Sequence, residues 1–271
     1  MSDQHAVYVD LVAEGEAVDQ IVAGLDPADW GLPTPAPGWT IAHQIAHLAS
    51  VCRLAEAAAA NPEMFKEQAA GASGDFDAAV YELLKPYLNH EPPELLERWR
   101  ADRAAASAAL SALPPGQMVP WLARPLPAEV LASAGIMELF AHGQDIADTV
   151  GARREHTDRI WHLTAFAVRT WDFGYLARGL APPRDGFRFE LTSPSGCQWE
   201  FGPEDSVQRI SGPAVDFCLL ATRRRHRDDL ALVATGADAD KWLDIAQAYR
   251  GSPGQGRSPG QFAAPRIATT P

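Results

Sequence analysis

Long helical segments separated by proline-rich breaks constrain the first 150 residues more than any other feature of the sequence. Apolar residues recur there at intervals of three and four, which is the spacing of one helix face. This pattern predicts helices at 4–24, 40–60, 92–113 and 127–150, whereas residues 63–91 show no clear pattern. Proline removes a backbone donor, so segment 32–39 and the pairs Asn61-Pro62 and Pro114-Pro115 fall between helices. Four helices without a clear strand among them favour an antiparallel bundle.

The pattern changes after Gly151, where apolar and polar residues begin to alternate. Residues 187–192 and 197–201 alternate on either side of a Ser-Pro-Ser-Gly turn and predict a β-hairpin. We expect two more strands at 206–211 and 230–235, and helices at 157–180, 213–224 and 238–249. The predicted fold class is therefore α+β. Its parts are a four-helix bundle over residues 1–152, a smaller mixed α/β domain over 153–250 and a Gly/Pro-rich tail over 251–271.

Composition excludes several classes of partner. The formal net charge of −12 disfavours a nucleic-acid surface, which needs clustered positive charge. No apolar run approaches the roughly 18 residues of a membrane helix, and the first residues do not resemble a signal peptide. Cys52, Cys197 and Cys218 are widely spaced, which indicates neither a disulfide framework nor a thiolate zinc site. We expect a cytoplasmic protein that acts on a small molecule, with no membrane partner, and leave open whether it forms a homodimer.

Three residues have the pattern of a metal site. Glu138 and His142 are four positions apart, which places both side chains on one face of a helix. His47 lies on a separate predicted helix that can supply a third ligand. Imidazoles and carboxylates bind zinc and related divalent ions, and an open catalytic site typically uses three protein ligands. Asp145 follows His142 by three residues on roughly the same face, where it can orient a ligand histidine.

These residues also have ordinary structural explanations. A glutamate and a histidine four positions apart are common on helices, usually as an exposed pair, so the spacing needs structural context. His43 and His47 have the same spacing, but only one of them can face the interior, and we interpret His43 as an exposed helix residue. The sequence contains no P-loop, dinucleotide-binding glycine turn or G-x-S-x-G elbow, so ATP, NAD and serine-hydrolase chemistry lack support.

Two segments resemble a known family. Residues 33–49, PTPAPGWTIAHQIAHLA, and residues 137–151, MELFAHGQDIADTVG, are similar to the DinB-like superfamily, in particular to its mycothiol-dependent maleylpyruvate isomerase family. The resemblance is closest to a subgroup of uncharacterised two-domain actinobacterial metal-binding proteins, and it extends into the C-terminal half. It implies a DinB-like four-helix bundle in which His47, Glu138 and His142 bind zinc or another divalent ion. Nickel, iron and manganese accept the same ligands.

The resemblance also implies an activity. It predicts a metal-dependent thiol S-transferase or isomerase that activates a low-molecular-weight thiol, by resemblance mycothiol as a co-substrate. The thiol would be transferred to an electrophilic small molecule or would promote its isomerisation. Two other hypotheses stay open. One is metal-assisted hydrolysis or rearrangement without a thiol, in secondary metabolism; the other is a non-catalytic metal-binding or ligand-binding protein.

The chain departs from the subgroup beside its first predicted ligand. Relatives tend to carry Trp-Thr-Asp where this chain has Ser50, Val51 and Cys52. One turn from His47, small groups thus replace a bulky aromatic residue and an acid. The change either reshapes the substrate pocket or reflects ordinary drift in helix packing.

Two further features have competing interpretations. The basic run at residues 223–227 suits binding of a carboxylate or phosphate, but a solvated helix end that complements the helix dipole is the more ordinary explanation. Trp30, Trp39 and Trp121 lie near loops beside the predicted site, where they either wall a pocket or pack in the core.

Overall fold

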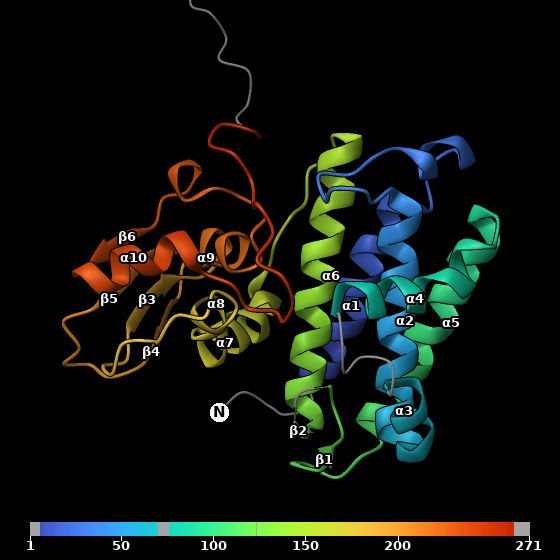
Figure 1. The fold of residues 1–271 in the computed structure, drawn as a ribbon, viewed down its shortest axis with the longest axis horizontal. Helices are drawn as coiled ribbons and strands as arrows, with labels where there is room; N and C mark the ends of the chain where they lie inside the picture. Colours follow the sequence, from blue (N-terminus) through green and yellow to red (C-terminus); the bar gives the residue numbers. More distant parts are fainter. Residues whose placement is uncertain (1–5, 70–75, 123, 263–271) are drawn as a thin grey trace, which may run out of the picture. The chain divides into compact units, whose positions relative to one another are not determined.

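The structure, a computed structural model, describes residues 6–69, 76–122 and 124–262. Its contacts divide the chain into two units, residues 1–155 and 156–271 (Figure 1). The first unit is helical and the second contains the larger sheet, so the predicted α+β class is confirmed. Within the described ranges, no helix is both long and apolar enough to cross a membrane.

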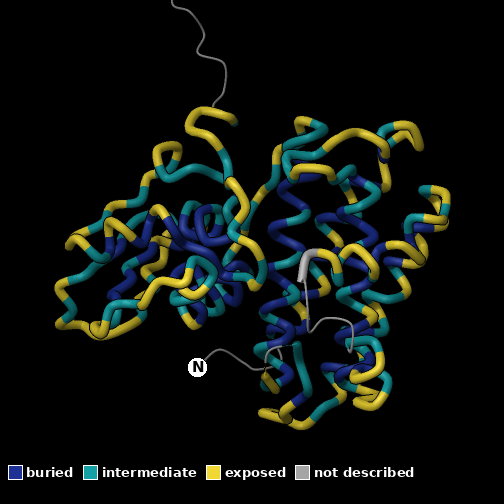
Figure 2. The backbone as a smooth tube through the Cα atoms, in the orientation of Figure 1, coloured by how far each residue is buried: buried dark blue, intermediate teal, exposed yellow. Residues whose placement is uncertain are grey.

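Four helices form the bundle of the first unit. They are α1 (Ala6–Val22), α2 (Ile41–Ala60), α5 (Pro92–Ser111) and α6 (Ala128–Val150). Both α1 and α2 pack on α5 and on α6, and the buried faces of all four helices share one core (Figure 2). The helix ends follow the local signals: Thr40 caps α2, Pro92 begins α5, and Gly151 ends α6 in the left-handed conformation at φ 69°.

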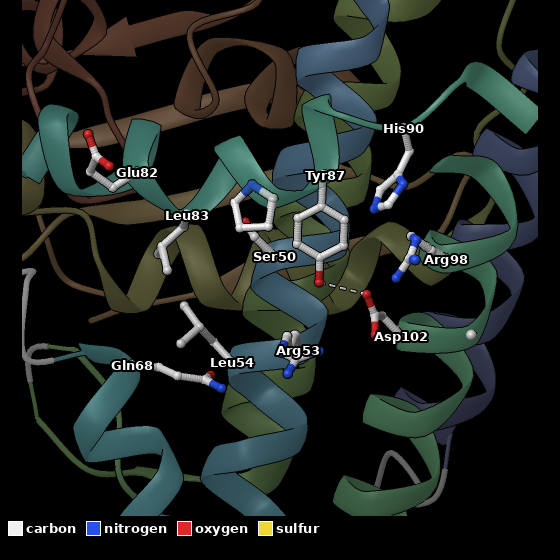
Figure 3. Close-up of a pocket in the computed structure, with 12 residues that line it drawn as sticks. Ser50, Arg53, Leu54, Gln68, Glu82, Leu83, Tyr87, His90, Arg98 and Asp102 are labelled. Carbon is white, nitrogen blue, oxygen red and sulfur yellow. Dashed lines mark hydrogen bonds between the residues drawn. The ribbon is translucent and has the colours of Figure 1, made fainter. Parts of the chain in front are cut away.

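Two additional helices cover α2. Residues 63–91, which show no clear sequence pattern, contribute α3 (Pro62–Ala69) and α4 (Phe76–Leu88), and both pack on α2. A cavity of about 460 Å³ lies among α2, α4 and α5 (Figure 3). The sequence shows no clear strand in this unit, but the structure contains one short pair, in which β1 (Met118–Val119) and β2 (Leu126–Pro127) pair antiparallel. Each has two residues, too few to show an alternating pattern.

A buried ion pair joins α1 to the chain just after α6. Arg154 Nη2 lies 2.5 Å from Glu14 Oε1, and the two side chains are only 5% and 1% exposed. Arg154 Nη1 also donates to the carbonyl of Phe140 at 2.6 Å. Gly143 leaves room for this arginine, since a Cβ at that position would lie 3.2 Å from the guanidinium carbon and 2.6 Å from Val18. Because a buried charge must be paired, this contact fixes how α1 lies on α6.

The second unit is built on a four-stranded sheet in the order β4-β3-β5-β6. Its strands are β3 (Arg188–Thr192), β4 (Gln198–Phe201), β5 (Arg209–Pro213) and β6 (Val233–Thr235). The β3–β4 hairpin is confirmed, while β5 runs parallel to β3 on its other side and pairs antiparallel with β6. Four helices accompany the sheet: α7 (Trp161–Arg169), α8 (Phe173–Leu176), α9 (Ala214–Ala221) and α10 (Ala237–Ile245).

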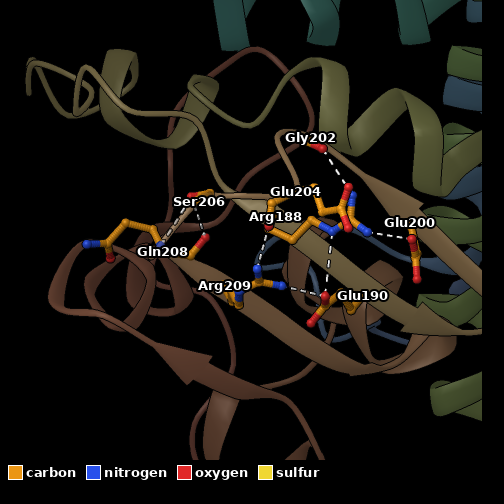
Figure 4. Close-up of polar contacts among 8 residues, drawn as sticks. All are labelled: Arg188, Glu190, Glu200, Gly202, Glu204, Ser206, Gln208 and Arg209. Carbon is orange, nitrogen blue, oxygen red and sulfur yellow. Dashed lines mark hydrogen bonds and ion pairs between the residues drawn. The ribbon is translucent and has the colours of Figure 1, made fainter.

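The two faces of this sheet differ in character. On one face, Phe189 packs against Phe217 and Trp242, with ring centroids 5.4 and 5.7 Å away. On the other face, ion pairs connect β3, β4 and β5 (Figure 4). Glu190 Oε1 lies 2.6 Å from Arg209 Nη1 and 3.5 Å from Arg188 Nε. Arg188 also pairs with Glu200 on β4. Opposite charges on neighbouring strands stabilise this register.

The prediction of one helix over residues 157–180 is wrong. A 3-10 turn at Asp158–Ile160 is followed by α7 and then by the short α8. Thr170 Oγ1 donates to the carbonyl of Phe166 at 2.9 Å and lies 3.3 Å from that of Ala248. Gly174 sits so close to the end of α10 that a Cβ there would lie 2.0 Å from the Ile245 carbonyl oxygen. Contacts with a segment far later in the chain therefore interrupt the helix.

Other elements of this unit differ from the prediction at their ends. The helices expected at 213–224 and 238–249 end at Ala221 and Ile245. Beyond these ends, Arg223 adopts φ 60° and Ala248 N donates to the carbonyl of Ala221 at 2.8 Å. The strands expected at 206–211 and 230–235 begin later, at Arg209 and Val233. Of the predicted tail at 251–271, residues 263–271 lie outside the described residues.

The basic run at 223–227 does not form one patch. It begins just after α9, at a helix end, but none of its five residues is exposed, so the expectation of a solvated run is wrong. Arg224 is buried, and Arg227 pairs with Asp240 at 2.5 Å and with Asp244 at 3.0 Å. His226 Nδ1 accepts the backbone N–H two residues later at 3.2 Å. These partners support a structural role for the run.

We expect the Glu14→Ala variant to lose about 3–5 kcal/mol of unfolding free energy, because it leaves the buried Arg154 guanidinium without its carboxylate. Urea unfolding followed by circular dichroism measures this loss. Glu16→Ala, two residues away on α1 but exposed, is the matched control and should change stability by less than about 0.5 kcal/mol. Equal stability of the two variants would contradict the proposed importance of the pair.

Candidate metal centre

Helix α2 places His47 toward α6. Thr40 N-caps this helix, and its backbone N–H donates to His43 Nδ1 at 3.3 Å. His43 is half-buried, so the expectation that it is an exposed helix residue is wrong, because capping holds its ring against the first turn. One turn later on the same side, His47 is 13% exposed and faces Glu138.

Helix α6 supplies the other two residues at the predicted spacing. Glu138 Oε2 lies 3.3 Å from His47 Nε2 and 3.2 Å from His142 Nε2. One potential ligand atom from each of the three residues lies within 4.8 Å of the other two. Among the described residues, these three form a cluster that could hold a metal ion. The side chains of Glu138 and His142 are 23% and 12% exposed. The tertiary structure therefore brings together the three residues that the sequence singled out.

The spacing of these atoms suits a divalent ion. Zinc binds nitrogen and oxygen at about 2.0–2.2 Å, so two ligands in tetrahedral geometry lie about 3.4 Å apart. The nitrogen-to-oxygen distances of 3.3 and 3.2 Å agree with that separation. The donor set of two imidazoles and one carboxylate also leaves room in a tetrahedral shell for one further ligand.

A chain of hydrogen bonds orients His142. Thr34 Oγ1 donates to the carbonyl of Trp39 at 2.9 Å, so it must accept from Gln44 Nε2 at 2.8 Å. The amide of Gln44 is thereby oriented, and its oxygen accepts Nδ1–H of His142. The Nε2 lone pair of the neutral ring then points toward Glu138 Oε2. A lone pair facing a carboxylate needs a positive charge between them. That charge is either a proton on Nε2, which then donates to Glu138, or a metal ion in its place.

The charge of Glu138 follows from its neighbours. Burial acts to raise its pKa, but the hydrogen bonds of His142 and His47 outweigh burial and hold the pKa well below its usual value. Glu138 is therefore a carboxylate at neutral pH, which is the form that binds a metal.

An indole ring lies against the two histidines. Trp39 stacks on His142 with ring centroids 5.7 Å apart and meets His47 edge-on at 5.4 Å. Its loop is held by a backbone bond from Thr34 N to the Trp39 carbonyl at 2.7 Å. The other two tryptophans singled out in the sequence are elsewhere: Trp30 is buried, and Trp121 stacks on Phe65. Trp39 is thus the tryptophan of this set that borders the cluster.

Small residues follow His47 on α2. Ser50 is buried, and its hydroxyl donates to the carbonyl of His47 at 2.8 Å. Burial and the charge of Asp102 raise the pKa of the Cys52 thiol to about 12. Cys52 is therefore a neutral thiol at physiological pH and is unsuited to act as a nucleophile.

Sequence reasoning missed Gln44 and assigned the orienting role to Asp145. Gln44 is completely buried on the face of α2 that also carries Ile41, Ile45 and Leu48, and a polar residue in that apolar pattern was the available signal. Asp145 is also completely buried on α6, and its predicted role toward a ligand histidine stays a prediction. Nδ1 of His47 has no hydrogen-bond partner among the described residues.

Comparisons with known proteins identify what the chain resembles. Residues 11–147 match the family model described as the mycothiol maleylpyruvate isomerase N-terminal domain. Residues 183–235 match a second model, described as wyosine base formation. Two uncharacterized proteins from two strains of Mycobacterium tuberculosis are each 42% identical to this chain over 261 residues. The matches cover 95% of this chain and 100% of theirs.

Two solved structures share the fold. They are the mycothiol-dependent maleylpyruvate isomerase and a mutant of it with one histidine replaced by alanine. Their TM-scores are 0.54 and 0.56, and each is 17% identical to this chain. The alignments cover 86% of this chain and 92% of theirs. This similarity is one of fold.

We expect Gln44→Leu, which keeps the size of the side chain, to lower the unfolding free energy by about 1–3 kcal/mol. The substitution leaves Nδ1 of His142 and the hydroxyl of Thr34 without their amide partner in a buried position. Urea unfolding checks the loss, with the exposed Gln20→Leu on α1 as control. Gln44→Leu as stable as the unmodified chain would argue against the hydrogen-bond chain.

Proposed function

Because the chain belongs to the mycothiol maleylpyruvate isomerase family, we propose that it is a divalent-metal enzyme that activates a low-molecular-weight thiol. The thiol, mycothiol or a close analogue, would serve the isomerisation of an electrophilic small molecule or be transferred to it. The observation that carries this proposal is the cluster of His47 Nε2, Glu138 Oε2 and His142 Nε2, whose spacing matches a single metal ion.

Each residue of the cluster has a separate role in this proposal. Glu138 contributes the negative charge, and its low pKa keeps it deprotonated. His142 presents Nε2 because Gln44 holds its Nδ1–H, and His47 contributes the ligand from α2. A divalent ion held by these three atoms would lower the pKa of a coordinated thiol, so that thiolate forms near neutral pH.

The surrounding residues restrict which thiol is used. Cys52, the cysteine of α2, is protonated because burial raises the pKa of its thiol. In this proposal the reacting sulfur therefore comes from a co-substrate. Trp39 covers part of the two imidazoles with an apolar ring, which limits water beside them and provides a flat surface for a substrate. We keep zinc as the first candidate ion, with nickel, iron and manganese as alternatives that accept the same donors.

We expect the protein purified without an affinity tag to contain about one divalent ion per chain by elemental analysis. His47→Ala and Glu138→Ala should lose this ion, because two ligands remain in each. Gln44→Leu should weaken binding about 10–100-fold through His142. His43→Ala, which removes a histidine one turn from His47, is the control and should keep the metal. Stoichiometric metal retained by His47→Ala would refute the ligand set.

We expect turnover of electrophilic small molecules only when mycothiol is present, measured across a panel of conjugated carbonyl compounds with and without the thiol. His142→Ala should lower kcat/KM at least about 100-fold, because it removes a ligand of the activating ion. Cys52→Ser should keep the activity, since its thiol is protonated and takes no part. Turnover without thiol would favour metal-assisted hydrolysis or rearrangement. Bound metal without any turnover would favour a non-catalytic binding protein.

A further inference from the structure

The cavity among α2, α4 and α5 is lined by none of the three residues of the metal cluster and has the size of a ligand site. Its volume of about 460 Å³ lies within the roughly 300–1,000 Å³ usual for small-molecule pockets. Its apolar wall comes from Leu54, Leu83, Pro86 and Ala101, on three different helices. Figure 3 shows Leu54 and Leu83 on one side of the cavity and the pair of Tyr87 and Asp102 on the other.

Most of the charged groups around this cavity already have partners. Glu94 lies 3.0 Å from Arg98 and 3.1 Å from His90, so one carboxylate holds both of these lining residues. Glu82, at the exposed rim, pairs with Lys85. These three ion pairs are satisfied within the protein and need no ligand.

Two lining residues of opposite charge remain. Asp102 Oδ2 accepts the hydroxyl of the buried Tyr87 at 2.8 Å, but Asp102 forms no ion pair within 4 Å among the described residues. Burial raises the pKa of Asp102 and outweighs the opposing effects of Tyr87, Arg53 and Arg98. Arg53, exposed at the rim, forms neither an ion pair nor a hydrogen bond within the described ranges.

Asp102 and Arg53 are near enough to influence each other electrostatically, yet they do not pair directly. A ligand with both an ammonium group and a carboxylate would satisfy the two residues together. An apolar substituent on that ligand would fill the space beside Leu54 and Leu83. A simple amine or a simple organic acid would leave one of the two charges without a partner.

We propose that this cavity binds an α-amino acid with an apolar side chain, with the ammonium at Asp102 and the carboxylate at Arg53. This site lies beyond the proposed thiol chemistry and uses none of the metal ligands. Asp102 in the cavity and Arg53 at its rim would each gain a charged partner on binding, which accounts for affinity and for selection of the zwitterion. The apolar wall accounts for selection of the side chain.

Isothermal titration calorimetry with L-leucine tests the proposal on the full-length protein. We compare L-leucine with 4-methylpentanoic acid, which lacks the amine, and with 3-methylbutylamine, which lacks the carboxylate. L-leucine should bind at least about tenfold more tightly than either analogue, since each analogue leaves one charge unpaired. Asp102→Asn and Arg53→Met should each weaken L-leucine binding by a similar factor.

Glu82→Gln at the rim is the matched control and should bind L-leucine like the unmodified chain, because Glu82 already pairs with Lys85. Arg53 is exposed, so Arg53→Met tests the proposal even if Asp102→Asn fails to fold. The proposal is overturned by absence of L-leucine binding at ~10 mM. It is also overturned if an analogue binds as tightly as L-leucine, or if Arg53→Met binds it as the unmodified chain does.

Discussion

The carboxylate of Glu138 is the group around which the first unit is arranged. It lies between two imidazole rings, 3.3 Å from one on α2 and 3.2 Å from the other on its own helix. A carboxylate that is largely withdrawn from water is costly unless positive charge or hydrogen bonds compensate it. Helices α2 and α6 therefore have to meet at this level with both histidines turned inward. The proposed metal ion is the group that would complete this arrangement.

Residues around the cluster form a chain of hydrogen bonds in which each donor has one acceptor. His142 donates to Gln44, Gln44 donates to Thr34, and Thr34 donates to the carbonyl of Trp39. This chain uses neutral groups to fix the orientation of the His142 ring. Hydrogen bonds of this kind hold metal ligands in position on rigid elements. The proline-rich loop before α2 thus has a structural purpose, because it carries both Thr34 and Trp39 to the cluster.

The extent to which sequence predicts this fold depends on where the deciding contacts lie. The helices of the bundle begin and end at residues with local signals, such as Thr40 before α2 and Gly151 after α6, and the predictions there agree with the structure. The break between α7 and α8 has no local signal. It follows from Thr170 and Gly174 meeting the segment at Ile245–Ala248, and tertiary contacts of this kind override helix propensity.

For the candidate site too, some features follow from local sequence and others only from tertiary packing. The sequence by itself determined that His47, Glu138 and His142 lie on helix faces able to meet, because helical spacing is a property of a few consecutive residues. The tertiary structure decided which atoms approach, since His47 and Glu138 are 91 positions apart and meet only through packing. It also decided that Gln44 accepts Nδ1–H of His142, and that Asp102 and Arg53 face one cavity. Those outcomes depend on side-chain packing between helices, which no local periodicity encodes.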